Sequence, residues 1–330
     1  MKERKDYYNS VAEAIGNTPL VRLNRLTAAR GIKATVLAKL EYLNPTGSVK
    51  DRMAVYILQK AAQAGELKPG GTIVEGTSGN TGAAVAMYAA AYGYKAIFTI
   101  PDKMSREKID TLKAFGAEVH VCPTTVAADS PQSYYETARR IHRETPDSYY
   151  IGQYFNLTNI EAHYVLTGPE IWAQTGGKID VLVGGVGTGG TISGSARFLK
   201  EQNPHIEVVA ADPVGSVYYQ YHKDQTLVEP HAYQVEGIGE DMLCPTIDFS
   251  VIDKIYQVTD KQCFMTAREM TRKEGLLIGG SGGGAAFVGL EYARTLAADK
   301  TMVIILPDSG IKYISKIYND EWMRENSFLD

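Results

Sequence analysis

Three glycine-rich segments, each with interspersed Ser or Thr, join an apolar run to a helical pattern. They are 75–82 (EGTSGNTG), 184–191 (GGVGTGGT) and 279–284 (GGSGGG). Glycine lets a backbone turn sharply and approach a ligand closely, and the unpaired amides at a helix start favour an anion. One such segment is as readily an ordinary tight loop between a strand and a helix. Three of them in one chain indicate a ligand with several acceptor groups, such as a phosphate and a carboxylate.

Lys50 lies in the segment 44–52 (NPTGSVKDR), directly before an apolar helical stretch at 53–62. A lysine at a helix start lies at the positive end of the helix dipole, which favours its neutral amine. A neutral amine can attack a carbonyl carbon and form a Schiff base. From the spacing alone, a solvated lysine is the more frequent role of such a residue, so its chemistry depends on what else the chain carries.

The segment 184–191 also satisfies the pattern GxGxxG, through Gly185, Gly187 and Gly190. It follows an expected strand, opens an expected helix, and is followed about 20 residues later by an acid, Asp212. That combination is the fingerprint of a dinucleotide-binding fold, in which the acid binds a ribose hydroxyl. A nicotinamide-dependent dehydrogenase is therefore an alternative. A Walker A loop is excluded, because no glycine-rich segment ends in Gly-Lys-Ser or Gly-Lys-Thr.

Short apolar runs alternate with helical patterns, which predicts an α/β fold with mostly parallel sheets covered by helices on both faces. The expected strands are 71–75, 95–100, 117–121, 180–183, 206–211 and 302–306. The expected helices are 81–92, 106–115, 191–202, 260–274 and 284–297. This pattern forms two batches, before and after about residue 150, which indicates two domains sharing a ligand-binding cleft.

Composition excludes several classes of function. The 330 residues carry 34 Lys and Arg against 38 Asp and Glu, a net charge of −4, so the chain is a poor candidate for binding nucleic acid. Its three cysteines form no CxxC pair, which excludes a zinc site built on cysteine and fits a reducing cytoplasm. The start has no apolar signal peptide, and no run of 18 apolar residues is present to span a membrane.

Taken together and in order, PTGSVKDR, EGTSGNTG, GVGTGGT and GGSGGG resemble the motifs of the fold-type II pyridoxal-phosphate enzymes, in the group of cysteine synthase and cystathionine β-synthase. Further motifs agree: IGNTPL from Ile15, QYFN from Gln153, EGIG from Glu236 and LPDS from Leu306. The segments 115–118, 129–133 and 235–239 are most similar to the catalytic core of cystathionine β-synthase. The resemblance runs from about Ile15 to the end of the chain.

Some positions depart from the eukaryotic pattern of that group. Glu240 stands where the pattern has an aromatic residue, and 282–284 is richer in glycine. Both lie near the expected substrate entrance, which leaves the second substrate open. Few residues precede Ile15 and the chain ends at Asp330, so we expect neither a haem-binding extension, and hence no haem, nor a regulatory domain pair.

The resemblance implies two three-layer αβα domains of the tryptophan synthase β-like fold. Residues 1–46 and 153–330 would form a large domain that binds the cofactor phosphate. Residues 47–152 would form a smaller, mobile domain that carries Lys50 and the TSGNTG loop. A homodimer in the cytoplasm is expected, with no bound metal.

The resemblance also assigns roles to residues of this chain. Lys50 would hold pyridoxal 5'-phosphate and, once displaced by the substrate's amino group, move the α-proton. The other cofactor contacts would come from Asn80 at the ring hydroxyl, Ser281 at the pyridine nitrogen, and Gly187, Thr188, Gly189, Gly190 and Thr191 at the phosphate. The substrate carboxylate would meet Thr77, Ser78, Gly79, Thr81 and Gln153. Tyr154, Glu236 and Gly237 would lie near the second substrate, with Glu236 receiving its amino group.

The implied reaction is a β-replacement on L-serine, or on an O-activated serine, through an aminoacrylate. Homocysteine as the nucleophile would give cystathionine, making the chain a lyase or transferase of cysteine biosynthesis by transsulfuration. The alternatives are an O-acetylserine sulfhydrylase and a synthase of a diamino-acid or lanthionine-type product. Outside this class stand the nicotinamide-dependent dehydrogenase and a ligand sensor that has lost its chemistry. The intact Lys50, Asn80 and Ser281 argue against the sensor.

Overall fold

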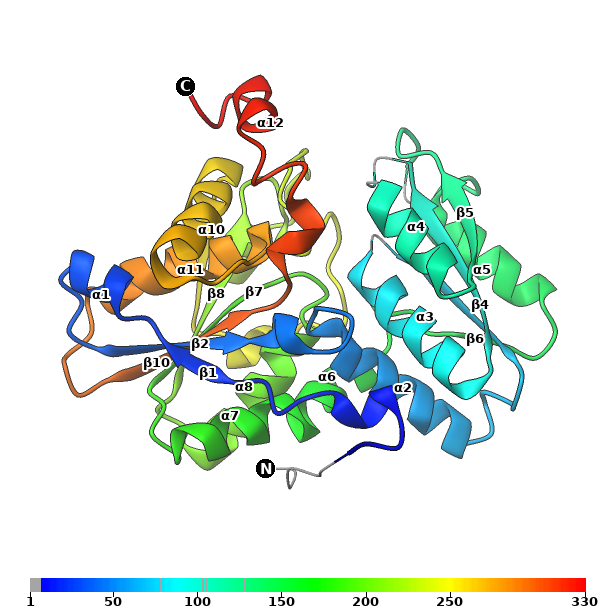
Figure 1. Cartoon of the computed structure of the whole chain (residues 1–330), viewed down its shortest axis with the longest axis horizontal. Helices are drawn as coiled ribbons and strands as arrows, with labels where there is room; N and C mark the ends of the chain where they lie inside the picture. Colours follow the sequence, from blue (N-terminus) through cyan, green and yellow to red (C-terminus); the bar gives the residue numbers. More distant parts are fainter. Residues whose placement is uncertain (1–6, 78, 103, 105, 128) are drawn as a thin grey trace. The chain divides into compact units, whose positions relative to one another are not determined.

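The computed structural model describes residues 7–77, 79–102, 104, 106–127 and 129–330. This part of the chain forms two compact units (Figure 1). The large unit comprises Gly16–Leu43 and Asn159–Asp330, and the small unit comprises residues 7–15 and Asn44–Thr158. The expected fold class, α/β with mostly parallel sheets, is confirmed. The expected domain bounds and the mobility of the smaller domain stay predictions.

The described part of the large unit has a sheet of six strands in the order β1-β2-β10-β7-β8-β9. The strands are β1 Leu20–Arg22, β2 Thr35–Leu40, β7 Val181–Gly185, β8 Glu207–Pro213, β9 Lys254–Val258 and β10 Thr301–Leu306. Only β1 pairs antiparallel with its neighbour within this described sheet. Parallel strands are buried on both faces and therefore read as continuous apolar runs, as MVIIL does in β10.

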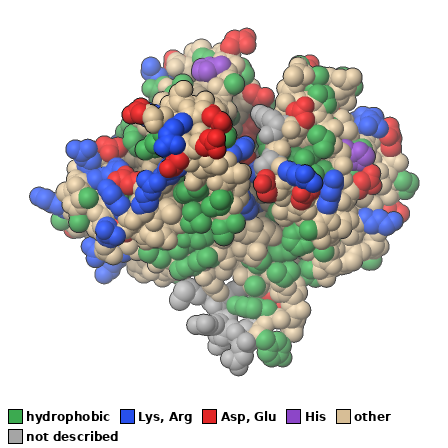
Figure 2. All heavy atoms as spheres, turned by 45° about the horizontal axis from the view of Figure 1, so that its top comes forward, with side chains coloured by type: hydrophobic (Ala, Val, Ile, Leu, Met, Phe, Trp, Pro, Cys, Tyr) green, Lys and Arg blue, Asp and Glu red, His purple; other side chains and the backbone are tan. Residues whose placement is uncertain are grey.

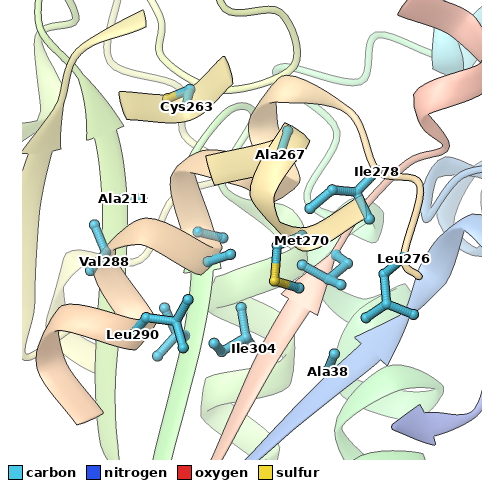
Figure 3. Close-up of a cluster of buried hydrophobic side chains, with 14 of the residues drawn as sticks. Ala38, Ala211, Cys263, Ala267, Met270, Leu276, Ile278, Val288, Leu290 and Ile304 are labelled. Atoms are coloured by element: carbon cyan, nitrogen blue, oxygen red, sulfur yellow. The ribbon is translucent and has the colours of Figure 1, made fainter. Parts of the chain in front are cut away.

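Helices cover both faces of this sheet, with α10 and α11 on one face and α7 and α8 on the other (Figure 1). The helices are α1 Arg25–Ala29, α6 Thr158–Val165, α7 Thr167–Thr175, α8 Gly190–Gln202, α9 Tyr218–Asp224, α10 Asp260–Glu274, α11 Gly280–Ala293 and α12 Asp320–Glu325. Short 3₁₀ helices are η2 Glu41–Leu43, η3 Phe249–Val251 and η4 Gly310–Tyr313. Figure 3 shows Met270, Ile278, Leu290 and Ile304 in the buried core of this unit.

The described part of the small unit has a parallel sheet of four strands in the order β5-β4-β3-β6. The strands are β3 Thr72–Gly76, β4 Lys95–Pro101, β5 Glu118–Cys122 and β6 Ser148–Tyr150. The helices are α2 Lys50–Gln63, α3 Asn80–Tyr92, α4 Arg106–Ala114 and α5 Tyr134–Glu144, preceded by the 3₁₀ helix η1 Val11–Ala14. The crossovers through α3 and α4 run one way along the sheet and the crossover through α5 returns, so right-handed connections place α5 on the opposite face.

Each sheet has a point where the direction of its crossovers reverses. In the small unit this point lies between β3 and β6, and in the large unit it lies between β10 and β7. Open α/β sheets bind ligands beyond the carboxyl ends of the strands at such points. The loops that follow β3, β6, β7 and β10 are therefore where the fold itself predicts a site.

In two of the glycine-rich segments, the connection between strand and helix is shorter than the sequence predicts. Gly184 and Gly185 still belong to β7, and α11 begins at Gly280, so the expected helix start at residue 284 is wrong. The glycines of α11 are needed because this helix packs closely on α10. A Cβ at Gly283 would lie 2.0 Å from the carbonyl oxygen of Cys263.

The surface shows no large field of one charge on the face seen in Figure 2, where basic and acidic side chains are interspersed. This agrees with the small net charge of −4. In the described part of the chain, no helix is both long and apolar enough to cross a membrane.

Candidate functional site

Lys50 is the first residue of α2 and is half-buried, so its amine lies at the positive end of that helix. The preceding loop is held by Asp51, which is fully buried. One oxygen of this carboxylate accepts a hydrogen bond from the Thr46 backbone amide at 2.7 Å, and the other accepts from the Thr46 hydroxyl. Asp51 thus orders the loop before Lys50 through these hydrogen bonds.

Glu75, which the sequence reasoning did not assign to the site, lies at the end of β3 and is fully buried. Its carboxylate accepts hydrogen bonds from the backbone amides of Gly152, at 2.8 Å, and Gln153, at 3.4 Å. Burial raises the pKa of Glu75 to about 8, against the lowering effects of those hydrogen bonds and of the Lys50 charge. A buried acid that interacts with Lys50 therefore also holds the loop after β6.

The loop between β3 and α3 carries the residues predicted to bind a substrate carboxylate. The Thr77 hydroxyl accepts from the backbone amides of Gly79, at 3.1 Å, and Gly82, at 3.2 Å. Gly79 has a φ of +146°, which favours glycine, and α3 begins directly after it at Asn80. Ser78 lies outside the described residues.

Gln153, predicted to close on the same carboxylate, contacts this loop within the small unit. Its side-chain oxygen accepts a hydrogen bond from the Thr81 hydroxyl at 2.6 Å, and both residues are buried. Tyr154 is buried beside it, with its ring in edge contact with Tyr135. The structure thus brings Thr77, Gly79, Thr81 and Gln153 together, around the crossover reversal of the small sheet.

In the large unit, the predicted phosphate turn leads from β7 into the start of α8, a helix of 13 residues. Asn159, which the sequence reasoning missed, donates to the Thr188 hydroxyl at 3.1 Å. A Cβ at Gly190 would lie 2.2 Å from the Asn159 side-chain oxygen, so only glycine fits there. The backbone amides of this turn and the Thr188 hydroxyl suit an anion with several acceptor oxygens.

The hydroxyl of Thr191 in the first turn of α8 is also oriented by a buried side chain. It lies 3.2 Å from Nε2 of His163, whose Nδ1 lies 2.8 Å from the Thr167 hydroxyl. His163 is fully buried, and its ring contacts both hydroxyls. No motif around His163 signals this contact in the sequence.

Ser281 is buried in the first turn of α11, and its hydroxyl lies 3.5 Å from a carboxylate oxygen of Asp308. The other oxygen of Asp308 accepts a hydrogen bond from the Tyr313 hydroxyl at 2.7 Å. Asp308 follows β10, so Ser281 lies close to the carboxyl end of that strand. The carboxyl end of β10 borders the point where the crossovers of the large sheet reverse direction.

The segment Glu236–Gly239 packs between the predicted phosphate turn and Ser281. A Cβ at Gly187 would lie 2.8 Å from the carbonyl oxygen of Gly237, and a Cβ at Gly237 would lie 3.6 Å from the Ser281 hydroxyl. Glu236 accepts a hydrogen bond from the Lys316 ammonium at 2.9 Å, an ion pair that the sequence did not predict. Glu236 therefore directly precedes a residue that packs beside the predicted cofactor contacts of its unit, and its side chain has a cationic partner.

Asp212, the acid on which the dinucleotide alternative depends, is fully buried. One oxygen of this carboxyl accepts from the Tyr219 backbone amide at 2.9 Å, and burial raises its pKa to about 7. A buried carboxyl used within its own unit does not suit the binding of a ribose hydroxyl. Gly185 likewise packs on Ile238, where a Cβ would lie 2.3 Å away, so the GxGxxG glycines serve close packing there.

Among the described residues, no group of three or more His, Cys, Asp or Glu side chains is arranged to hold a metal ion. The three cysteines form no disulfide and are buried.

Comparison with known proteins matches residues 11–308 to the model of a family described as "Pyridoxal-phosphate dependent enzyme". A cystathionine β-synthase of Apis mellifera is 47% identical over 97% of this chain and 63% of that protein. The Mus musculus cystathionine β-synthase is 44% identical over 97% of this chain and 57% of that protein. An "O-acetylserine dependent cystathionine beta-synthase" of Bacillus subtilis is 42% identical over 93% of this chain and 96% of that protein. The chain thus spans about three-fifths of the length of the animal relatives.

Proposed function

Because the chain belongs to the family of pyridoxal-phosphate dependent enzymes, we propose that it catalyses a β-replacement on an O-activated L-serine, with homocysteine as the nucleophile and cystathionine as the product. The observation that carries this proposal is the setting of Lys50. This half-buried amine begins a helix, interacts with buried Glu75, and shares one compact unit with an anion-binding loop. The helix start favours the neutral, reactive form of the amine, and the shared unit would place it close to a bound amino acid.

The residues present fit the cofactor by their chemistry. Lys50 supplies an amine for its aldehyde, and the α8 start supplies amides and the Thr188 and Thr191 hydroxyls for its phosphate. Ser281 supplies a buried hydroxyl for the ring nitrogen, and Asn80 supplies an amide for the ring hydroxyl. When bound, pyridoxal phosphate provides the electron sink for the electron pair left at the substrate's α-carbon.

The side chains of the small unit would bind the amino acid and move its proton. The backbone amides at the start of α3 would receive the substrate carboxylate, with the Gln153 side chain held in position by Thr81 and by the Glu75 contact to its backbone. The Lys50 amine would remove the proton from the α-carbon and return it after the nucleophile has added. Glu75, with its raised pKa, would be the neighbouring acid that responds to the charge on Lys50.

The leaving group is the part of the proposal that the relatives inform most. The Bacillus subtilis relative is named for O-acetylserine dependence and is matched over 96% of its length. Serine is the alternative to O-acetylserine, and sulfide is the alternative to homocysteine. The cytoplasmic location and the homodimer stay predictions, as do the individual roles of the site residues.

The proposal is tested by a substrate matrix with the purified holoenzyme. Serine, O-acetylserine and O-phosphoserine are each combined with homocysteine, cysteine and sulfide, and the products are identified by mass spectrometry. We expect the highest kcat/KM for O-acetylserine with homocysteine, and no turnover in Lys50→Ala. A higher kcat/KM for sulfide than for homocysteine would instead make the chain a cysteine synthase, and failure of every combination would refute β-replacement.

A further inference from the structure

We propose that Lys316, the ion-pair partner of Glu236, receives the α-carboxylate of an amino-acid nucleophile, beside the α-ammonium that the resemblance already assigns to Glu236. This inference rests on the proposed function, because it names the residue that would recognise the second substrate. The direct observation is the ion pair itself, with Lys316 Nζ 2.9 Å from Glu236 Oε1. Both side chains are partly accessible, at 30% and 20% exposure, so a solute can reach them.

The pair lies beside the elements predicted to hold the cofactor within the large unit. Glu236 precedes Gly237, whose carbonyl oxygen would lie 2.8 Å from a Cβ at Gly187, and a Cβ at Gly237 would lie 3.6 Å from the Ser281 hydroxyl. Lys316 closely follows η4, and the backbone amide of Lys316 donates to the carbonyl oxygen of Tyr313 at 3.1 Å. The Tyr313 hydroxyl also donates to Asp308, and Asp308 contacts the Ser281 hydroxyl. Residues next to Glu236 and residues bonded to Lys316 therefore both lie near the buried Ser281 hydroxyl.

The chemistry of the pair matches an amino acid and not a simple thiol or sulfide. A free α-amino acid carries an ammonium and a carboxylate on the same carbon, which is the complement of a carboxylate and an ammonium held side by side. A partly exposed ion pair contributes only about 0–1 kcal/mol, so opening it to admit such a ligand costs little. The new hydrogen bonds to charged groups would each be stronger than an ordinary one. Sulfide carries neither group, so its use would not depend on the pair.

The test compares Lys316→Met and Glu236→Gln with the wild-type holoenzyme. The nucleophiles are L-homocysteine, sulfide, 3-mercaptopropylamine, which lacks the carboxylate, and 4-mercaptobutanoate, which lacks the ammonium. We expect Lys316→Met to raise the KM for homocysteine and 4-mercaptobutanoate by about 10- to 100-fold, the usual effect of losing a hydrogen bond to a charged group. Glu236→Gln should raise the KM for homocysteine and 3-mercaptopropylamine instead. Neither variant should change the KM for sulfide.

A role as a structural brace makes a different prediction. The double variant Glu236→Lys with Lys316→Glu restores an ion pair but reverses its charges. A brace would recover the wild-type KM for L-homocysteine, which would overturn the proposal, whereas recognition keeps that KM raised. The matched control is Lys300→Met, which breaks the Lys300–Asp180 pair at the opposite end of β10 and should leave all four KM values unchanged.

A binding measurement separates this inference from the proposed function. Borohydride treatment fixes the cofactor on Lys50, so an amino acid can no longer displace that lysine. Calorimetric titration of the reduced holoenzyme with L-homocysteine should then give a Kd that rises about 10- to 100-fold in Lys316→Met and stays unchanged in Lys300→Met. An unchanged Kd in Lys316→Met would reject the inference while leaving β-replacement intact. The expected Kd rise in an enzyme that turns over none of the matrix combinations would reject the proposed function alone.

Discussion

Two acidic side chains, Glu75 and Asp212, are fully buried at the ends of β3 and β8. In both, burial raises the pKa, to about 8 for Glu75 and to about 7 for Asp212. The sequence shows each as an acid after an apolar run, which is also the pattern of a ligand-binding carboxylate at a strand end. Glu75 accepts from backbone amides more than 70 residues away, whereas Asp212 accepts from Tyr219, seven residues away. The burial of both acids depends on tertiary packing, so the sequence alone made Asp212 a candidate ribose ligand and overlooked Glu75.

The raised pKa of Asp212 predicts a pH dependence of stability. Because its folded pKa lies above the ordinary 3.8, the folded protein holds the proton more tightly than the unfolded chain, and this contribution is lost as pH rises through about 7. Asp212→Asn cannot ionise and keeps an acceptor for the Tyr219 amide. Relative to wild type, its unfolding free energy should gain on the order of 4 kcal/mol between about pH 4 and about pH 8, measured by urea unfolding. A difference that does not vary with pH would contradict the buried, protonated state.

At the scale of elements, the first turn of α11 shows why glycine is repeated in the third motif. A Cβ at Gly283 would lie 2.0 Å from the Cys263 carbonyl oxygen on α10, whereas a Cβ at Gly282 would meet its nearest neighbour, a flexible Ile278 side chain, at 3.3 Å. Gly283→Ala should therefore force α11 away from α10 and cost about 1–3 kcal/mol of unfolding free energy. Gly282→Ala is the matched control in the same turn.

The control should stay within about 1 kcal/mol of wild type, because Ala also has the better helix propensity. Both variants are measured by chemical unfolding, with the near-UV circular dichroism signal as a check on packing. Equal losses in the two variants would show that the close approach of α10 and α11 does not set the requirement for glycine at residue 283.

The sequence predicted best the elements with an uninterrupted apolar or helical pattern. The helix after Lys50 and the strand at residues 95–100 lie within a few residues of α2 and β4. The strand β2 was missed because Lys39 interrupts its apolar run. That lysine is fully buried, and its ammonium is paired with Glu170 and donates to Gln174 at 2.7 Å, partners more than 100 residues away. No local pattern could show that its charge is satisfied.

Two further elements escaped prediction for a different reason. The helix α5 buries only Ala138 and Ile141 among its described residues, so its sequence is mostly polar. The strand β9 lies at the sheet edge and exposes Tyr256 to solvent. Elements that bury one narrow face contain few apolar residues, and their place is decided by tertiary packing.

For the molecule as a whole, each compact unit carries its half of the predicted residues at the crossover reversal of its own sheet. Lys50, Thr77, Thr81 and Gln153 lie in the small unit, and the α8 turn and Ser281 lie in the large unit. The supporting side chains, Asn159, His163 and Lys316, come from segments without a recognisable motif and became visible only in three dimensions.

The central claim is that Lys50 is the residue that carries the cofactor, and peptide mapping after reduction tests it most directly. The purified protein is treated with borohydride, digested, and analysed by mass spectrometry. The account predicts a phosphopyridoxyl mass on the peptide that contains Lys50, and no such mass in Lys50→Ala. The same mass on a different lysine of the wild-type protein, with residue 50 unmodified, would contradict it.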